Sequence, residues 1–191
     1  MERTLVLVKP DGVARGLVGE VLSRFERAGL KIIGLKMTWV KPDHVDRHYP
    51  KTDEYLTNLG NKSLTTYEKY SLDAKAEIGT TDPLEIGKMV RSWLLDYISS
   101  GPVVAIAIEG VHAVDNIKKI AGPTLPNIAL PGTIRGDLST DSAWLGNAKK
   151  RAIKNIVHIS DNPKEAEYEV NLWFSEKELF SYKRADEDSM F

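Results

Sequence analysis

The stretch Val103-Val104-Ala105-Ile106-Ala107-Ile108 is a continuous apolar run. A run of this length that is rich in β-branched residues is typical of a strand buried on both of its faces. Gly101-Pro102 precedes the run and separates it from the segment before it. The run therefore predicts a buried strand, and the segments on either side decide what kind of sheet it joins.

Segments on both sides of this run have alternating helix and strand character. Residues 4–8 and 31–40 have the composition of strands, and the second places Ile33, Leu35, Met37 and Trp39 on one face. Helical spacing of apolar residues predicts helices over 17–28, 84–99 and 115–121. Weaker patterns predict helices over 53–59, 63–70, 148–157 and 176–180, a long loop over 122–141, and the last strand within 165–173.

The order of these elements predicts an α+β fold of the ferredoxin-like, split βαβ type (βαββαβ). We expect a four-stranded antiparallel sheet with helices on one face and additional helical insertions. We expect one domain over residues 1–183, with insertions at about 52–93 and 139–149, and a flexible tail over 184–191. The polar and acidic composition of the last residues favours the flexible tail.

Composition excludes several classes of function. The 191 residues carry a formal net charge of -1, so no overall basic field attracts nucleic acid. No apolar stretch approaches the roughly 18 residues that a membrane span requires. The chain has no cysteine, which excludes disulfides and thiolate chemistry. The absence of cysteine and of a signal peptide fits a cytoplasmic protein, and we expect partners other than nucleic acid or membrane.

The stretch Asn155-Ile156-Val157-His158-Ile159-Ser160-Asp161 carries the most chemistry. A single histidine is more often structural or solvated than catalytic. His158 differs from the other three histidines because an amide, a hydroxyl and a carboxylate surround it in the sequence, which places it in an organised polar setting at the predicted end of a helix. A nucleophilic imidazole needs a partner on its other ring nitrogen, and Glu169 could supply it directly or through Ser160.

Two cations are suited to a phosphate. Lys9 follows the first predicted strand, and Arg135 lies between two glycines in the long loop, where its guanidinium could bind phosphate oxygens. Taken singly, Lys9 reads as a turn residue and Arg135 as a surface arginine. The chain lacks Walker A and G-x-G-x-x-G loops, so side chains and a magnesium ion held mainly by the nucleotide must bind the phosphates.

Five motifs in the same order resemble nucleoside diphosphate kinases. They are Lys9-Pro10-Asp11-Gly12, Arg15-Gly16-Leu17-Val18-Gly19, Ser100-Gly101-Pro102-Val103, the run 131–137 that contains Arg135, and the run 155–161. The resemblance covers about residues 2–183 and implies a ferredoxin-like core in a homo-oligomer, usually a hexamer and less often a tetramer or dimer. It implies γ-phosphoryl transfer from ATP or another nucleoside triphosphate to a nucleoside diphosphate, by a ping-pong route through His158, which maintains nucleotide pools.

The same resemblance assigns roles to further residues. It implies that Ser160 and Glu169 position the histidine and that Asp161 lies near the Mg²⁺ that accompanies the nucleotide, with no permanent metal site. It implies that nucleotide contacts come from Lys9, Tyr49, Lys118, Thr124, Arg135 and Asn155.

Two departures from the family pattern leave alternatives open. Lys118 stands where the family usually has an arginine, which keeps the charge but loses bidentate geometry. No family-like aromatic stretch for stacking on the base is found between residues 52 and 93. A catalytically silent assembly or nucleotide-sensing module is therefore one alternative. A single-stranded nucleic-acid binder is another, although the chain lacks the aromatic strand signature of such proteins.

Overall fold

The computed structural model describes residues 1–190, which form two compact units. Unit 1 contains Met1–Trp39, Pro102–Thr140 and the chain from Asn155 onward, and unit 2 contains Val40–Gly101 and Asp141–Lys154. Of the segments that we interpret as insertions, 52–93 falls in unit 2, and 139–149 falls there except for its first two residues. The division into one domain with two insertions stays a prediction.

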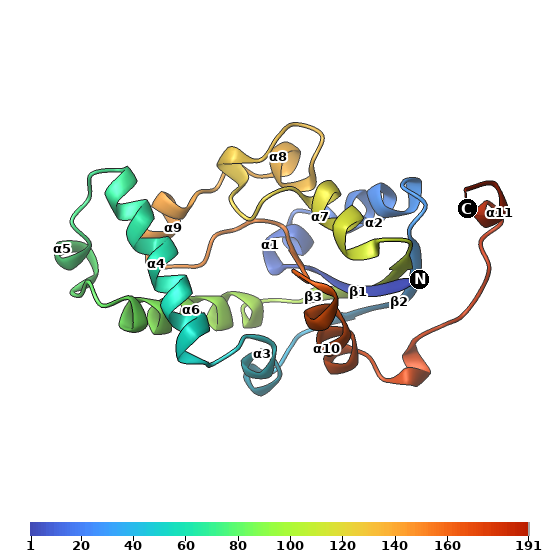
Figure 1. The fold of residues 1–191 in the computed structure, drawn as a ribbon, viewed down its shortest axis with the longest axis horizontal. Helices are drawn as coiled ribbons and strands as arrows, with labels where there is room; N and C mark the ends of the chain where they lie inside the picture. The colour runs from blue at the N-terminus through green and yellow to red at the C-terminus, as the bar shows by residue number, and fades with distance from the viewer. Residues whose placement is uncertain (191) are drawn as a thin grey trace. The chain divides into compact units, whose positions relative to one another are not determined.

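Unit 1 contains a four-stranded antiparallel sheet, as predicted (Figure 1). Its strands are β1 (Glu2–Val8), β2 (Lys31–Thr38), β3 (Val103–Gly110) and β4 (Val157–Ile159), in the order β2-β3-β1-β4. The run 103–108 forms most of β3, a central strand, and every residue of it is buried. The apolar composition of this run is explained by its position between two neighbouring strands in a sheet that is covered on both faces.

Helices cover both faces of this sheet, so the expectation of helices on one face is wrong. On one face, Val6 and Ile106 pack with Phe25 of α2 (Val18–Arg27) and Ile117 of α7 (Ala113–Ala121). Side chains alternate along a strand, so Leu7 points to the other face, where it is also buried. There α10 (Pro163–Trp173) packs against β1, on the side of the sheet opposite α2 and α7 in Figure 1.

The end of the chain departs from the sequence-based prediction in two places. Residues 149–156 are not helical, because Lys150 and Ile156 adopt positive φ angles of 49° and 69°, and His158 therefore lies in β4 instead of ending a helix. The segment expected to contain the last strand is the helix α10. Asn162 caps this helix by accepting a 3.0 Å hydrogen bond from the Glu165 N–H, and Pro163 occupies its first position.

Unit 2 is helical. Thr52 caps α4, which is one continuous helix, so the prediction of two short helices over 53–59 and 63–70 is wrong. The predicted helix over 84–99 is confirmed as α6, and Asp82 caps it by accepting from the N–H groups of Leu84 and Glu85. The helices of unit 2 are α3 (Pro42–His48), α4 (Asp53–Lys69), α5 (Ala74–Ile78), α6 (Pro83–Ser99) and α9 (Ala143–Ala148).

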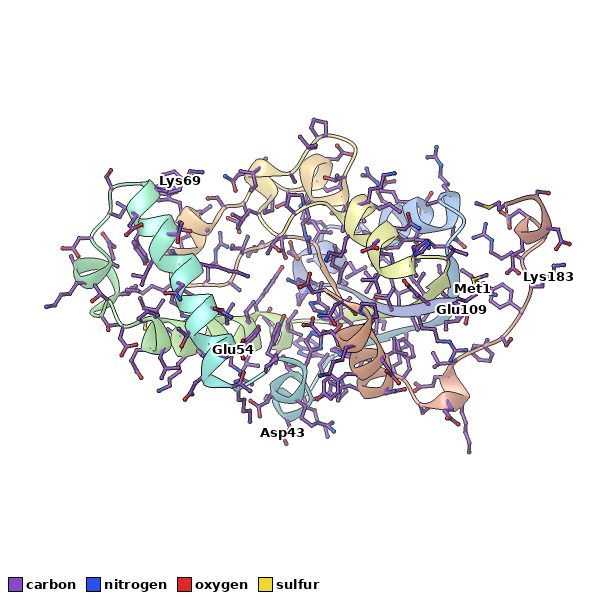
Figure 2. All side chains as sticks on the ribbon, in the orientation of Figure 1. Met1, Asp43, Glu54, Lys69, Glu109 and Lys183 are labelled. Carbon is purple, nitrogen blue, oxygen red and sulfur yellow. The ribbon has the colours of Figure 1, made fainter. Side chains whose placement is uncertain are left out.

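The charges at the two ends of α4 suit its dipole. Figure 2 shows Glu54 in the first turn of the helix and Lys69 in the last. Negative charge near a helix N-terminus and positive charge near its C-terminus are each stabilising, by roughly 0.3–1 kcal/mol. This arrangement supports a long helix despite the glycine at position 60 within it.

The remaining short elements belong to unit 1. They are α1 (Pro10–Ala14), η1 (Pro126–Ile128), α8 (Ile134–Leu138), η2 (Glu176–Glu178) and α11 (Glu187–Met190). The segment expected to be a helix over 176–180 is the single 3₁₀ turn η2. Within residues 1–190, no helix is both long enough and apolar enough to cross a membrane.

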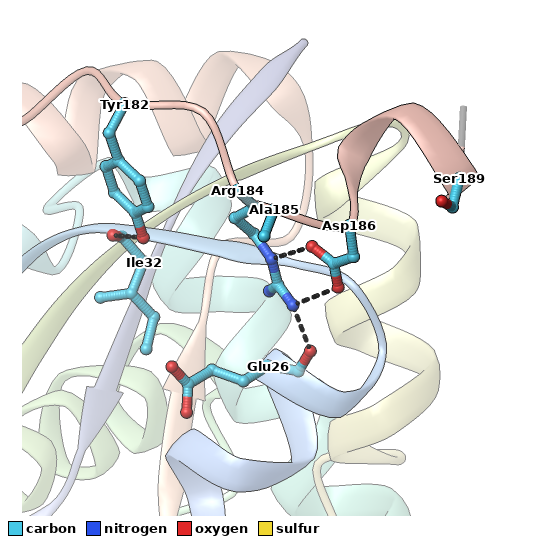
Figure 3. Close-up of a pocket in the computed structure, with 7 residues that line it drawn as sticks. All are labelled: Glu26, Ile32, Tyr182, Arg184, Ala185, Asp186 and Ser189. Carbon is cyan, nitrogen blue, oxygen red and sulfur yellow. Dashed lines mark hydrogen bonds and ion pairs between the residues drawn. The ribbon is translucent and has the colours of Figure 1, made fainter.

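The C-terminal segment lies beside the start of β2. Tyr182 donates its hydroxyl hydrogen to the Ile32 carbonyl at 2.9 Å, and Arg184 donates to the carbonyl of Glu26 and to the carboxylate of Asp186, which line a shallow pocket (Figure 3). The predicted flexibility of residues 184–191 stays a prediction, and its last residue, Phe191, lies outside the described residues.

We expect Gly87→Ala to destabilise unit 2. A Cβ at Gly87 of α6 would collide with the backbone carbonyl of Leu56 in α4, and one at Gly60 of α4 would collide with the carbonyl of Pro83. Because backbone must move, we expect a loss of about 1–3 kcal/mol in unfolding free energy, measured by denaturant titration. Gly19→Ala is the control: apart from its chain neighbours and the backbone of its own helix α2, nothing lies within 4 Å of its Cβ position, so stability should hold or rise. Equal stability of both variants would contradict close packing of α4 on α6.

Candidate active site

A chain of hydrogen bonds runs from β1 to the ring of His158. Leu5 of β1 donates its N–H to the Ser160 hydroxyl at 3.3 Å, and that hydroxyl donates to Glu169 Oε2 at 2.6 Å. Glu169 lies on α10, is buried, and accepts from His158 Nε2 at 2.9 Å. A carboxylate can only accept, so the proton of the neutral ring is on Nε2 and the lone pair is on Nδ1. The ring is thereby held in the tautomer that a nucleophilic nitrogen requires.

Asn155 connects two buried cations. Its side-chain oxygen accepts from Lys9 Nζ at 2.7 Å, and its backbone oxygen accepts from Arg135 Nε at 3.3 Å. Its amide nitrogen donates to the carbonyl of Thr124 at 2.9 Å. Lys9 comes directly after β1, and Asn155 lies just before β4. Since β1 and β4 pair, with Leu7 opposite His158, the histidine lies on the strand next to the one that leads into Lys9.

Arg135 lies in α8 and is 4% exposed. Besides the bond to Asn155, it donates from Nη1 to the Gly122 carbonyl at 2.6 Å and from Nη2 to the Val157 carbonyl at 2.8 Å. Burying a guanidinium is unfavourable unless hydrogen bonds compensate for the lost hydration. Three backbone carbonyls do so here, and two of the five N–H donors of the guanidinium are not used by these bonds.

Burial shifts the pKa values of both cations. The pKa of Lys9 is lowered to about 7, mainly by desolvation and also by the nearby charge of Arg135, while the charge of Asp11 opposes the shift. Desolvation also lowers the pKa of Arg135, to about 10. An anion placed beside these groups would favour their charged forms, so the pair forms an electrostatic site suited to a phosphate.

Lys118 and Asp161 form an exposed ion pair. Lys118 Nζ in α7 donates to the Asp161 carboxylate at 3.0 Å and to the Asp161 carbonyl at 2.9 Å. The Asp161 side chain is 75% exposed. Exposed pairs of this kind contribute little to stability, so a ligand can separate them at small energetic expense.

Unit 1 therefore contains all but one of the residues predicted to form the site. His158, Ser160 and Glu169 are linked to each other, as are Lys9, Asn155, Thr124 and Arg135. Tyr49 belongs to unit 2, where it is buried at the end of α3, and its nucleotide-binding role stays a prediction.

Comparison with known proteins identifies the family. The family model for nucleoside diphosphate kinase matches residues 2–58 and 85–179. The chain belongs to the nucleoside diphosphate kinase family. The unmatched residues 59–84 fall within the first segment that we interpret as an insertion.

Individual members of the nucleoside diphosphate kinase family resemble the whole chain. The enzyme of Pyrobaculum aerophilum is 48% identical over 179 residues, which are 94% of this chain and 98% of the relative. Its crystal structure superposes with a TM-score of 0.92 at 47% identity, covering 94% of this chain and 99% of that one. Membership of the family makes the protein a phosphotransferase.

Two nucleoside diphosphate kinase structures with ligands are also similar. One is a transition-state mimic from Borrelia burgdorferi with bound vanadate and ADP (36% identity, TM-score 0.78, covering 98% of this chain and 95% of that one). The other is the enzyme of Halobacterium salinarum in complex with CDP (31% identity, TM-score 0.71, covering 100% of this chain and 98% of that one).

Sequence reasoning about this kinase missed the carbonyl groups that hold Arg135. These acceptors belong to the main chain, at Gly122, Asn155 and Val157, so residue types give no sign of them. It also missed that Asp11 accepts from the N–H of Ile156 at 3.2 Å. An aspartate in the turn Lys9-Pro10-Asp11-Gly12 was the available signal, because turn aspartates commonly accept from backbone N–H groups.

We expect nucleotide affinity to fall as the pH rises above about 7.5. The pKa of Lys9 is about 7, and a phosphate beside it would raise that pKa, so above pH 7 the complex binds more protons than the free protein. Affinity for ADP with Mg²⁺ should then fall by at most about tenfold per pH unit, in a range where the terminal phosphate is already ionised. Calorimetry in buffers of different ionisation enthalpy measures the proton uptake.

Lys9→Met is the matched variant for this measurement. It should bind nucleotide more weakly at pH 7, with no proton uptake at this position and a flat pH dependence. Equal proton uptake by the variant and the unmodified protein would show that another group is responsible.

Proposed function

We propose that this protein transfers the γ-phosphoryl group of a nucleoside triphosphate to a nucleoside diphosphate through a phosphohistidine at His158, and so maintains nucleotide pools. The observation that carries the proposal is the bond from His158 Nε2 to Glu169, at 2.9 Å. It leaves the nucleophilic lone pair on Nδ1 in the neutral ring. Ser160 and Glu169 are positioning residues for this ring.

The reaction has two symmetric steps. The Nδ1 lone pair attacks the γ-phosphorus, the bond from that phosphorus to the bridging oxygen breaks, and the first nucleoside diphosphate leaves with both bonding electrons. A terminal oxygen of the second diphosphate then attacks the phosphohistidine, and the bond from phosphorus to Nδ1 breaks. The imidazole is regenerated, so one site serves both nucleotides.

The cations stabilise the charge that spreads over the transferring oxygens. Lys9 and the two remaining donors of Arg135 are suited to the phosphates, because both groups are held in place before the ligand arrives. The other nucleotide contacts in this proposal come from Tyr49, Lys118, Thr124 and Asn155. Replacing the family's arginine by Lys118 weakens a phosphate contact without removing its charge.

Magnesium enters this proposal with the nucleotide. Asp161 offers an exposed carboxylate oxygen in unit 1, and such hard oxygen ligands are what Mg²⁺ prefers, so the residue fits an outer contact to the ion. The ion would neutralise charge on the phosphates. Lys118 would need to release Asp161, which is compatible with the exposure of that pair.

The nucleotides are the partners we propose for this chain. ADP and CDP are bound by two similar enzymes, one with a purine and one with a pyrimidine base. We therefore propose that ATP and other nucleoside triphosphates serve as donors and that several diphosphates serve as acceptors. Because these substrates are cytoplasmic metabolites, we place the reaction in the cytoplasm.

We also propose a homo-oligomer, with the hexamer as the expected form. Strand β2 lies at the edge of the sheet, and Leu35 and Met37 within it and Trp39 just after it are more than half exposed. An exposed apolar edge strand favours association and is usually covered. A second copy of the chain offers the same strand, which matches the self-complementary contact of a two-fold dimer.

We expect one phosphoryl group on His158 after incubation with ATP and Mg²⁺. Intact-protein mass should rise by one phosphoryl group that is labile in acid, stable in base, and discharged by a second nucleoside diphosphate. His158→Ala should bind nucleotide without this gain. His44→Ala, a histidine of unit 2 outside the proposed machinery, is the control and should be labelled normally. Full labelling of His158→Ala, or nucleotide binding without label in the unmodified protein, would disprove the mechanism.

We expect Met37→Asp to reduce the oligomeric mass. The chain mass is 21.3 kDa, so light scattering distinguishes a hexamer from its dissociation products. A charge at an exposed position has little effect on the fold of one chain, but it is costly inside an interface. Val111→Asp replaces another exposed apolar residue and should leave the mass unchanged. A monomeric unmodified protein would contradict the proposal.

A further inference from the structure

The residues just before the proposed nucleophile form a strained turn. The N–H of Val157 donates to the Asn155 carbonyl at 2.7 Å, which closes a three-residue γ-turn, and Ile156 at its centre has a φ of 69°. Positive φ is unfavourable for a β-branched residue because the side chain crowds the backbone. Among residues 1–190, Ile156 is the β-branched residue that adopts such a conformation. Strain of this kind persists only where the surroundings impose it.

The start of α1 imposes this conformation. The Asp11 carboxylate accepts from the Ile156 N–H at 3.2 Å, and the Lys9 N–H donates to the Ile156 carbonyl at 2.8 Å. Both backbone groups of the strained residue are therefore bonded to the turn 9–12. The fit is close, because a Cβ at Gly12 would lie 3.1 Å from the Ile156 carbonyl oxygen and 2.8 Å from Cγ1 of Val8.

The turn connects two parts of the site. Asn155, which binds Lys9, begins it, and His158 follows directly after Val157. A change in φ at Ile156 would rotate the chain on one side of the turn relative to the other. It would therefore move the buried lysine and the imidazole apart or out of alignment. Displacements of about 1 Å at a reacting group can lower a rate by about 100-fold.

We propose that Asp11 is a positioning residue for phosphoryl transfer, which keeps Asn155 and His158 in register by holding Ile156 in its strained conformation. The inference rests on the proposed role of His158 as the phosphoryl acceptor. Asp11 acts through the N–H of Ile156 and does not need to touch the nucleotide. Its second effect, a charge that favours the protonated form of Lys9, is separable by mutation.

Three variants test the proposal in the full-length protein. Asp11→Ala removes the acceptor, and we expect a fall of about 10- to 100-fold in the single-turnover rate of His158 phosphorylation by ATP with Mg²⁺. Asp11→Asn keeps an oxygen acceptor in the same place without the charge and should recover most of that loss. Gly12→Ala changes no charge, but its added methyl group would crowd the carbonyl of Ile156. It should lower the phosphorylation rate without changing the pH dependence of that rate.

The control and a second readout separate positioning from stability. Asp73→Ala also removes a carboxylate that accepts backbone N–H groups, at the start of α5 in unit 2, and should leave the rate unchanged. Hydrogen exchange measures the turn itself: the amide of Ile156 should exchange faster in Asp11→Ala, without global unfolding.

Each outcome decides the proposal. Normal phosphorylation of Asp11→Ala, or unchanged exchange at Ile156, would overturn it. An Asp11→Asn rate as low as that of Asp11→Ala would also overturn it, because the charge on Lys9 would then be the cause. If the unmodified protein forms no phosphohistidine, the proposed function fails, and hydrogen exchange still decides whether Asp11 holds the turn.

Discussion

The buried guanidinium of Arg135 is the interaction on which the rest of the site depends. It joins the loop at Gly122 to both ends of the turn 155–157, where strand β4 begins. Removing it would take a donor from each of these carbonyls, although the Asn155 carbonyl would keep the Val157 N–H, and each buried group left unsatisfied costs about 1–3 kcal/mol. A lysine could not replace it, since an ammonium lacks the planar spread of donors that reaches three carbonyls in different directions.

The same residue makes the site receptive to anions. Arg135 is held by neutral carbonyls, and Lys9 donates to the neutral amide of Asn155 while the charge of Asp11 acts on it, so part of the positive charge is buried against dipoles. The lowered pKa of Lys9 follows mainly from its burial, which disfavours the charged form of the side chain. A bound phosphate favours that charged form. Phosphate binding would therefore offset part of the destabilisation that the buried positive charge causes. Such destabilisation is common at functional sites that require strain or charge.

Local sequence patterns predicted the regular elements well where one physical signal dominated. The apolar run 103–108 predicts a buried strand, and the helical spacing of apolar residues over 84–99 predicts α6; both are confirmed. The last strand was placed in the wrong segment, and the true fourth strand was missed. Ala166, Val170 and Trp173 follow helical spacing and are buried on one face of α10, so the prediction of the last strand within 165–173 is wrong. The fourth strand is instead only three residues long, too short for an alternating pattern to be recognised.

The sequence predicted which residue types form the site, but it did not predict the backbone conformation that brings them together. The cations, the amide and the histidine belong to motifs that are visible in the sequence. Their geometry, however, depends on the positive φ of Ile156, and an isoleucine in the sequence does not indicate positive φ as a glycine does. The predicted helix over 148–157 fails for this reason. Secondary-structure propensity reflects the local conformational preference of a residue. Ile156 departs from its preference because it is hydrogen-bonded to residues more than 140 positions away in the sequence.

Strand β4 shows why stability and catalysis are difficult to separate in this fold. An edge strand of three residues has few ladder hydrogen bonds and is marginal by itself. It is fixed by side chains from elsewhere: Glu169 of α10 binds His158, and Arg135 binds the carbonyl of Val157. These bonds also orient the imidazole and place the cation. The contacts that keep the edge strand in the sheet are thus the contacts that prepare the site, so a change that loosens one loosens the other.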